Sequence, residues 1–186
     1  MTTKNSLETF ITDVKSFWGP LTTEMVTRCR TLLEGLAQAP IAEEWLAELH
    51  RDPPEDKQLY RDPEHDFLLN AYVEQQDRYR APHDHGAGWV VYAVQHGEME
   101  MGTYARMTEA NGHVRLVQRD VQRMRAGDCM VYLPGDIHDT RCISTNALLL
   151  RFTSCDLKRE SKEGRMTRYV QQHGVWTLGR VRAMTE

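Results

Sequence analysis

Six short apolar segments follow one another between residues 67 and 154, and this run constrains the fold more than any other feature. Each segment is of strand length, and Gly, Pro, Asn or Asp lies between consecutive segments, as between antiparallel strands joined by turns. Asn111-Gly112 separates two of them and predicts a β-hairpin. The segments are residues 67–75, 88–96, 98–107, 114–124, 129–133 and 147–154. This part of the chain predicts an antiparallel β-barrel or sandwich.

The first 50 residues have a helical pattern instead. Apolar residues recur at steps of three and four in residues 6–18, 25–36 and 41–49, and proline-containing breaks separate these runs. A polar, proline-rich connection, "HRDPPEDKQLYRDPEHD", then marks the clearest boundary in the chain. We expect a helical segment over residues 1–50, packed on a barrel over residues 51–186, the two together forming one domain of ordinary size.

Composition excludes several classes of partner. The 186 residues carry a formal net charge of -4 without a clustered basic excess, so we expect no nucleic-acid binding. The longest apolar run, "WVVYAV", is too short to cross a bilayer, and the N-terminus lacks a signal-peptide pattern. We therefore expect a cytoplasmic protein that does not bind membranes. The four cysteines show no CxxC spacing, and we expect them to be free thiols.

Two histidines one residue apart, His83 and His85, precede an apolar run in "PHDHGAGWVVYAV". Residues two apart in a strand point to the same face, so both imidazoles are expected to enter one space. A surface pair at a strand end is the alternative. His138 follows "GDCMVYLPGDI", and a strand with a tight turn can return this residue to the same cavity as a third metal ligand.

The pairing of these two stretches resembles the two sequence motifs of the cupin superfamily. The matching residues are His83, His85 and Gly97 in the first motif, and Gly127, Asp128, Pro134 and His138 in the second. The resemblance implies a mainly β fold, a cupin-type antiparallel barrel (double-stranded β-helix) with an N-terminal helical segment. It implies less about the chemistry, because cupins host many activities. The other five histidines, His50, His65, His96, His113 and His173, lie in polar or turn contexts and are expected to be solvated.

Many cupins carry a glutamate ligand four or five residues after the second histidine, where this chain has Trp89 and Val90. Three histidines without a carboxylate resemble the thiol dioxygenases, of which cysteine dioxygenase is the best-known member. That resemblance implies a mononuclear Fe(II) enzyme that oxidises a small anionic organic thiol to its sulfinate with dioxygen. Imidazole also binds Zn, Ni or Mn, so iron is implied by the resemblance and not by the ligands.

An anionic substrate calls for a cation, and arginine offers a planar pair of donors to a carboxylate. Arg61, in "LYRD", stands about where cysteine dioxygenases carry their carboxylate-binding arginine, and is the first candidate. Arg151 is the second, because it interrupts the otherwise apolar "ALLLRFTS" and would need an anion if it entered the barrel. Arg78 and Arg80 are rivals.

The chain departs from the animal cysteine dioxygenases around the metal. Val90 stands where those enzymes carry the cysteine of their Cys-Tyr crosslink. With a gap of two residues allowed, Arg151 and Thr153 stand where they carry a histidine and a tyrosine that surround the iron ligands. Trp89, four residues after His85, is expected to share the ligand face. Tyr92 would then point the opposite way unless a bulge intervenes.

Three alternatives stay open. The same histidines could serve another metal-cupin reaction on a small acid or diketone: oxidative C–C cleavage, a lyase or an isomerase. The barrel could be a non-catalytic module that binds a small ligand. The histidines could also hold a structural zinc, although such sites usually have four protein ligands. The sequence predicts no oligomeric state.

Overall fold

The computed structural model describes residues 4–179 of the chain. Three helices come first, α1 (Ser6–Phe17), α2 (Thr23–Ala37) and α3 (Glu44–Arg51), as the apolar spacing predicts. Asn5 caps α1 by accepting a hydrogen bond from the Glu8 backbone N–H, and the Glu8 carboxylate accepts one from the Asn5 backbone N–H in return. The Thr22 side chain caps α2 by accepting from the Met25 backbone N–H.

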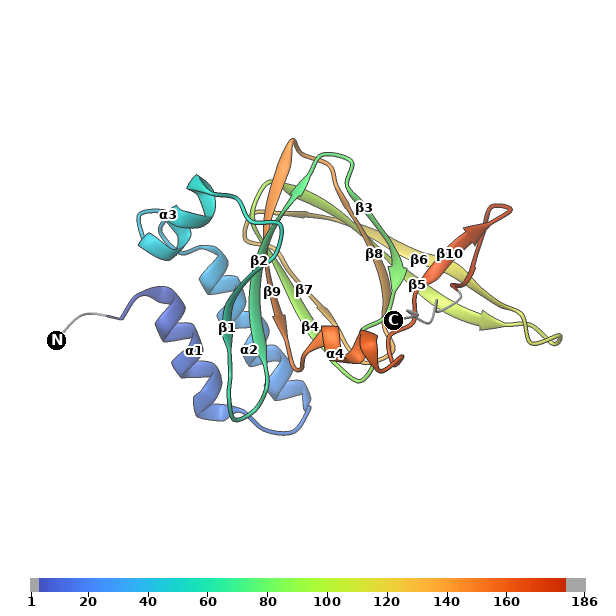
Figure 1. The fold of residues 1–186 in the computed structure, drawn as a ribbon, viewed down its shortest axis with the longest axis horizontal. Coiled ribbons are helices and arrows are strands. Elements are labelled where there is room, and N and C mark those ends of the chain that lie inside the picture. Colours follow the sequence, from blue (N-terminus) through green and yellow to red (C-terminus); the bar gives the residue numbers. More distant parts are fainter. Residues whose placement is uncertain (1–3, 180–186) are drawn as a thin grey trace.

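Nine of the strands form two antiparallel sheets that face each other (Figure 1). The five-stranded sheet has the order β1-β2-β9-β4-β7 and the four-stranded sheet the order β3-β8-β5-β6. The strands of the first sheet are β1 (Lys57–Arg61), β2 (Leu68–Gln75), β9 (Asn146–Thr153), β4 (Val90–His96) and β7 (Cys129–Tyr132). Those of the second are β3 (Tyr79–His83), β8 (Ile137–Cys142), β5 (Glu98–Thr108) and β6 (Val114–Arg125).

Each sheet combines strands that are far apart in the sequence: β9 lies between β2 and β4 in one sheet, and β8 lies between β3 and β5 in the other. This crossing order is that of a jelly roll, also called a double-stranded β-helix. The predicted fold, a mainly β antiparallel barrel of the cupin type with helices at the N-terminus, is confirmed. Gly112, with φ +81°, supports the predicted turn between β5 and β6.

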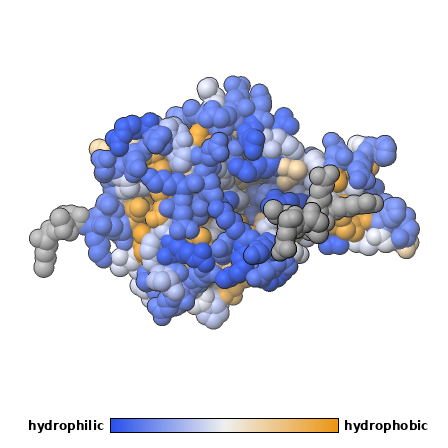
Figure 2. All heavy atoms as spheres, viewed as in Figure 1, coloured by the Kyte–Doolittle hydropathy of each residue, from blue (hydrophilic) through white to orange (hydrophobic). Residues whose placement is uncertain are grey.

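The helices cover the outer face of the five-stranded sheet (Figure 1). Successive side chains of β9 point to opposite faces of the sheet, so one face can pack against the helices and the other can line the barrel. Leu150 and Phe152 pack among the helices, whereas Leu149 faces the barrel interior. The β5–β6 hairpin extends away from the body on the opposite side (Figure 1). The face shown in Figure 2 is largely hydrophilic.

Several elements were not predicted from the sequence. Strand β8, "IHDTRC", is too polar to be recognised, because its inward residues include a histidine and a threonine. Strand β1 lies inside the stretch that we interpreted as a connection. Helix α4 (Leu157–Lys162) and the hairpin of β10 (Tyr169–Gln172) and β11 (Val175–Leu178) follow the barrel and lie within the range predicted as barrel.

The three N-terminal helices all lie before residue 52, and the strands begin at Lys57. The division of the domain at residue 50 stays a prediction. None of the helices between residues 4 and 179 combines the length and apolar character that a bilayer span requires. All four cysteines are free thiols, as predicted.

Candidate metal centre

His83 and His138 are register partners in the antiparallel pair β3–β8, so their side chains point to the same side of the sheet. Their ring centroids lie 4.7 Å apart. Nδ1 of His83 lies 2.9 Å from the carbonyl oxygen of Ala81, which fixes a proton on Nδ1 and leaves the Nε2 lone pair free. The strand pairing thus places the imidazoles of His83 and His138 side by side, and the hydrogen bond to Ala81 orients that of His83 as a ligand.

His85 lies beyond the end of β3, in the loop that leads to β4. The expectation that one strand carries both histidines is therefore wrong in detail, although both rings enter the same space. Nε2 of His85 lies 3.3 Å from Nε2 of His138. One ring nitrogen from each of His83, His85 and His138 lies within 4.8 Å of the other two. The structure thus brings the three sequence-predicted ligands together.

All three imidazoles are buried in the barrel: His83 is 9% exposed, and His85 and His138 are 0% exposed. Burial lowers the pKa of all three, and the neighbouring imidazoles add to this effect for His85, whose pKa falls to about 3, and for His138. At neutral pH the rings are uncharged, as metal ligation requires.

The separation of two of the three donors, on His85 and His138, fits a metal ion. Two nitrogens at about 2.1 Å from a cation lie about 3.0 Å apart at a right angle and about 3.4 Å apart at a tetrahedral angle, and the His85–His138 separation of 3.3 Å falls between these values. Nδ1 of His85 and Nδ1 of His138 have no hydrogen-bond partner among the described residues. Three buried, uncharged imidazoles with converging nitrogens are a poor structural core and a suitable ligand set.

Two tyrosines line the histidines. The ring of Tyr132 stacks on that of His138, with centroids 3.8 Å apart and 25° between the planes. The hydroxyl of Tyr92 lies 3.5 Å from Nε2 of His85. Burial raises the pKa of both tyrosines, so both hydroxyls keep their protons at neutral pH.

The expectations for Trp89 and Tyr92 are the reverse of what the structure shows. Trp89 packs among the helices, against Trp18 and Phe152, whereas Tyr92 faces the histidines. The reason is the turn after His85, where Gly86 adopts φ +63°. The alternation of side chains along a strand is interrupted at this turn, so the facing of Trp89 and Tyr92 cannot be predicted from their distance to His85 in the sequence.

Arg151 is the candidate arginine that enters the barrel interior. It lies in β9 between Asn70 of β2 and Tyr92 of β4, and its guanidinium carbon is 5.4 Å from the centroid of the Tyr72 ring. Its side chain is 24% exposed, and its nearest carboxylate is that of Asp56, at 3.9 Å. The buried Nε has no hydrogen-bond partner among residues 4–179.

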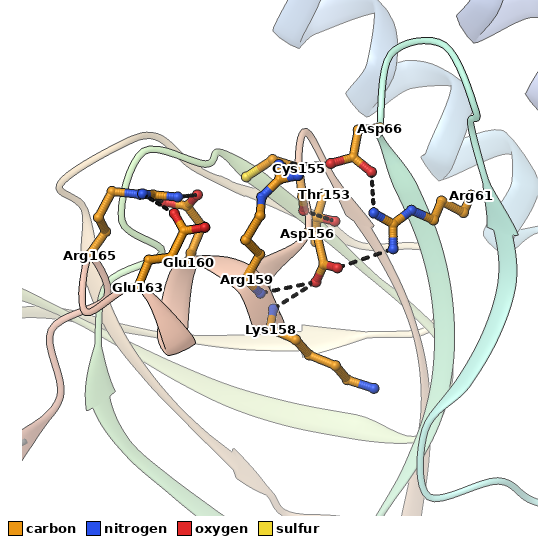
Figure 3. A network of polar contacts seen from close by, with 10 residues as sticks. All are labelled: Arg61, Asp66, Thr153, Cys155, Asp156, Lys158, Arg159, Glu160, Glu163 and Arg165. Carbon is orange, nitrogen blue, oxygen red and sulfur yellow. Dashed lines mark hydrogen bonds and ion pairs between the residues drawn. The ribbon is translucent and has the colours of Figure 1, made fainter. Parts of the chain in front are cut away.

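Arg61 lies elsewhere, in an exposed ion-pair network (Figure 3). Its Nη2 lies 2.5 Å from Oδ1 of Asp66 and its Nη1 lies 3.1 Å from Oδ2 of Asp156, at 42% side-chain exposure. The sequence position suggested the pocket, but β1 is the outer strand of its sheet and two carboxylates already hold the guanidinium. The expectation that Arg61 binds the substrate therefore finds no support in its surroundings.

The rival arginines are both exposed and lie beside one buried carboxylate. Arg80 donates from Nε to Glu74 at 2.5 Å, and Nε of Arg78 lies 4.0 Å from the same carboxylate. Both rivals are exposed and share the charge of Glu74, whereas Arg151 has a buried Nε without a hydrogen-bond partner among the described residues. These contacts favour Arg151 over both rivals.

The loop that carries His85 is held by residues that sequence reasoning missed. The carboxylate of Glu160, in α4, accepts the Ala87 backbone N–H at 3.1 Å and bonds from Arg165 at 2.8 and 2.5 Å (Figure 3). A Cβ at Gly86 would lie 2.7 Å from this carboxylate, so glycine is required there. Asp84 accepts the backbone N–H groups of Gly86 and Thr167. Only the glycines flanking the motif could have indicated so tight a turn.

The remaining histidines lie away from the cluster. His96, His113 and His173 are exposed, as predicted. His50 and His65 are half-buried and only partly solvated: His50 lies 2.8 Å from the Gln95 side chain, and His65 stacks on Trp18.

No protein-family model matches the chain, and no curated protein matches it. Among solved structures, it matches the cupin domain of Schizosaccharomyces pombe Cnp3 at 11% identity, over 59% of this chain and 66% of that chain, with a TM-score of 0.44. The structural neighbours include several cupin proteins.

Two other matches are KdgF from Halomonas sp. and oxalate oxidase in complex with glycolate. KdgF is 17% identical over 53% of this chain and 74% of that chain, with a TM-score of 0.41. Oxalate oxidase is 17% identical over 55% of this chain and 52% of that chain, with a TM-score of 0.42. The first of the matched structures, Peruvianin-I, is covered over 51% of its length, so the chain spans about half of that protein.

Proposed function

We propose that the chain is a mononuclear Fe(II) dioxygenase that oxidises a small anionic organic thiol to its sulfinate. The observation that carries this proposal is the convergence of three buried imidazoles, with no carboxylate in the cluster that the described residues form. Three uncharged ligands leave the full charge of a divalent ion to attract an anionic substrate. The absence of a carboxylate ligand is also the feature by which the sequence resembles the thiol dioxygenases.

His83, His85 and His138 would hold the ion. Bound Fe(II) supplies the redox chemistry by which both atoms of dioxygen are transferred to a thiolate, giving a sulfinate. The protein's own part is positioning and the exclusion of water, since the ligands are 0–9% exposed. Zn, Ni or Mn would also bind imidazoles, so the metal content must be measured first.

Arg151 binds the carboxylate of the substrate in this proposal. Its buried Nε has no partner, and a charged donor in such a place calls for an anion. The hydroxyl of Tyr92, next to both His85 and Arg151, can donate a hydrogen bond to a substrate oxygen. The substrate is thus expected to be a thiol whose carboxylate lies a few bonds from the sulfur.

The test is dioxygen uptake by anaerobically purified, Fe(II)-loaded protein, with a panel of small thiols and β-diketones and with product mass as the second readout. We expect uptake with a thiol and a product heavier by two oxygen atoms. Arg151→Ala should raise KM for a carboxylate-bearing thiol by about 10- to 100-fold, the cost of a lost charged hydrogen bond. Arg61→Ala, the matched control at the surface, should leave KM unchanged. No uptake with any thiol by iron-loaded protein would refute the proposal.

A metal-dependent isomerase or lyase acting on a small acid is the second candidate. The contact that favours it is the protonated Tyr92 hydroxyl beside His85, since a buried hydroxyl can serve as a general acid. Solvent-deuterium incorporation into a carboxylic acid, without dioxygen uptake, would support this reaction and exclude the first. Binding of small acids without turnover would instead support a ligand-binding module.

A further inference from the structure

The ligand cluster is closed to solvent, because His85 and His138 are 0% exposed. An anionic substrate therefore needs a route through the barrel wall. The two sheets are not hydrogen-bonded to each other at their edges, and one of these open edges, here called the seam, lies between β7, the last strand of the five-stranded sheet, and β6, the last strand of the four-stranded sheet.

A cavity of about 420 Å³ fills this seam. All four residues of β7 line it, together with residues of β5, β6 and the β7–β8 turn. Thr103 and Tyr132 connect it with the histidines, because Thr103 is the register partner of His138 and the Tyr132 ring stacks on the His138 ring at 3.8 Å. One aromatic ring therefore separates the cavity from a candidate metal ligand.

The Tyr132 ring is held in place by weak acceptors. Its hydroxyl donates to the thioether sulfur of Met130, at 2.6 Å, and lies 3.4 Å from that of Met101. Thioether sulfur is a poor acceptor compared with water or a carboxylate. Little is therefore lost when the hydroxyl exchanges these contacts for a ligand or a water molecule, although the ring itself is 2% exposed and stacked on His138.

The wall of the cavity is positively charged. Arg30 of α2 and Arg119 of β6 both line it and are exposed. Within residues 4–179 neither guanidinium forms an ion pair. Asp136 also lines the cavity, but its carboxylate accepts the Leu133 backbone N–H at 2.7 Å. The two arginines and Asp136 give the lining residues a net charge of +1, which favours anions. The carboxylates of Glu34 and Asp128, which act on the lining residue Cys129, lie outside the lining.

We propose that the seam cavity is the route by which the anionic substrate reaches the three histidines. Arg30 and Arg119 attract the anion, and Tyr132 is the movable residue between the cavity and His138. The inference rests on the proposed metal centre and on an anionic substrate, but not on the identity of the reaction.

The test follows azide, a small anion, as it binds to Co(II)-loaded protein, by stopped-flow absorbance of the cobalt. Arg30→Glu combined with Arg119→Glu should slow association about tenfold at low salt, and the difference should fade at high salt. Lys162→Glu in α4 is a control that makes the same charge change as Arg119→Glu at an exposed residue outside the cavity. Equal slowing by Lys162→Glu and Arg119→Glu would overturn the role of the seam arginines.

A steric test addresses the route itself. Gln122 lines the cavity, whereas Val121, the next residue of β6, does not line it and is 44% exposed. Cys129 lines the cavity and Cys155 is also partly exposed, so both are first replaced by serine. In that background a bulky maleimide on Gln122→Cys should slow azide association at least tenfold, and the same label on Val121→Cys should not. Unchanged association in labelled Gln122→Cys would overturn the route. So would a failure of azide to reach bound cobalt in the unmodified protein.

These outcomes are separate from the test of the proposed function. A protein that admits azide through the seam and consumes no dioxygen with thiols would keep the route and lose the dioxygenase. A protein that oxidises thiols while its labelled seam is blocked would keep the reaction and lose the route.

Discussion

Phe152 and Arg151 are neighbours in β9, yet they face two interiors of opposite character. Phe152 contacts the rings of Phe10, Phe67 and Trp89 between the helices and the five-stranded sheet. Arg151 faces the barrel interior, where tyrosines, methionines and the histidines gather. The helix-facing core is apolar and close-packed, as stability requires, whereas the barrel interior keeps polar groups that stability alone would not select. The difference assigns stability to one core and chemistry to the other.

The strongest test of this division is Phe152→Ala. A buried phenylalanine truncated in a packed core costs about 3–5 kcal/mol, and this side chain is 0% exposed. The free energy of unfolding, from urea denaturation, should fall by that amount while the folded fraction still binds one metal ion per chain. Val117→Ala, at a 44% exposed strand residue, is the control and should change stability little. Loss of metal binding by well-folded Phe152→Ala would show that the two cores are not independent.

His138→Ala should have the converse effect. Loss of a group that hydrogen-bonds to a metal ligand lowers metal affinity about 10- to 100-fold. Loss of the ligand itself should therefore lower metal affinity at least about 100-fold. The free energy of unfolding of the metal-free protein should fall by less than in Phe152→Ala: the truncation leaves a cavity, but the lost ring is polar and one of its buried nitrogens has no partner. Titration with Co(II) and urea denaturation measure the two quantities. His113→Ala, at an exposed histidine, is the control, and unchanged affinity in His138→Ala would refute the ligand set.

Glu160→Gln tests the contact between α4 and the His85 loop. Its hydrogen bonds from Arg165, with that from Ala87, lower the pKa of Glu160 to about 2, below the ordinary 4.5. Because the folded-state pKa is depressed, the stabilisation is present above pH 4.5 and is lost as the pH falls towards 2. The variant should be about 1–3 kcal/mol less stable at pH 7.

The difference between the wild-type protein and Glu160→Gln should shrink between pH 4.5 and pH 2, measured by urea denaturation at each pH. Glu163→Gln is the matched control, because Glu163 also pairs with Arg165 but is 44% exposed. A pH-independent difference between wild type and Glu160→Gln would contradict the assignment.

Tyr132→Phe should have the smallest effect on stability. The lost hydroxyl has only thioether partners, so the cost should stay below about 1 kcal/mol. Tyr104→Phe is the comparison, since its hydroxyl donates to the buried Asp139 carboxylate at 2.5 Å, and its cost should be about 1.5–3 kcal/mol. Thermal denaturation of both variants measures the difference. Equal costs would mean that Tyr132 is as firmly held as Tyr104.

The strands of the barrel could be predicted from the sequence where apolar residues alternate with polar ones or follow one another, as in β2, β4, β5 and β9. Strand β8 could not, because its inward side chains serve the candidate site and carry His138. The pair His83 and His85 was predicted from their local spacing, whereas His138 was added by the strand and turn before it and by the resemblance of this stretch to the second cupin motif. The substrate-binding arginine was not predicted correctly. The structure shows that two carboxylates hold Arg61 at the surface, whereas Arg151 lies beside Tyr72 with a buried Nε that has no partner and has one carboxylate, that of Asp56, at 3.9 Å.

The contacts around the His85 loop have a consequence for the order of events during synthesis. The loop at residues 83–88 is clamped by Glu160 and Arg165, and by the backbone of Thr167, all of which lie more than 70 residues later in the chain. A nascent chain that has emerged only as far as His138 holds all three imidazoles but not the clamp that orients one of them. If the three histidines bind a metal as proposed, the complete site forms only after the chain has been made as far as Thr167.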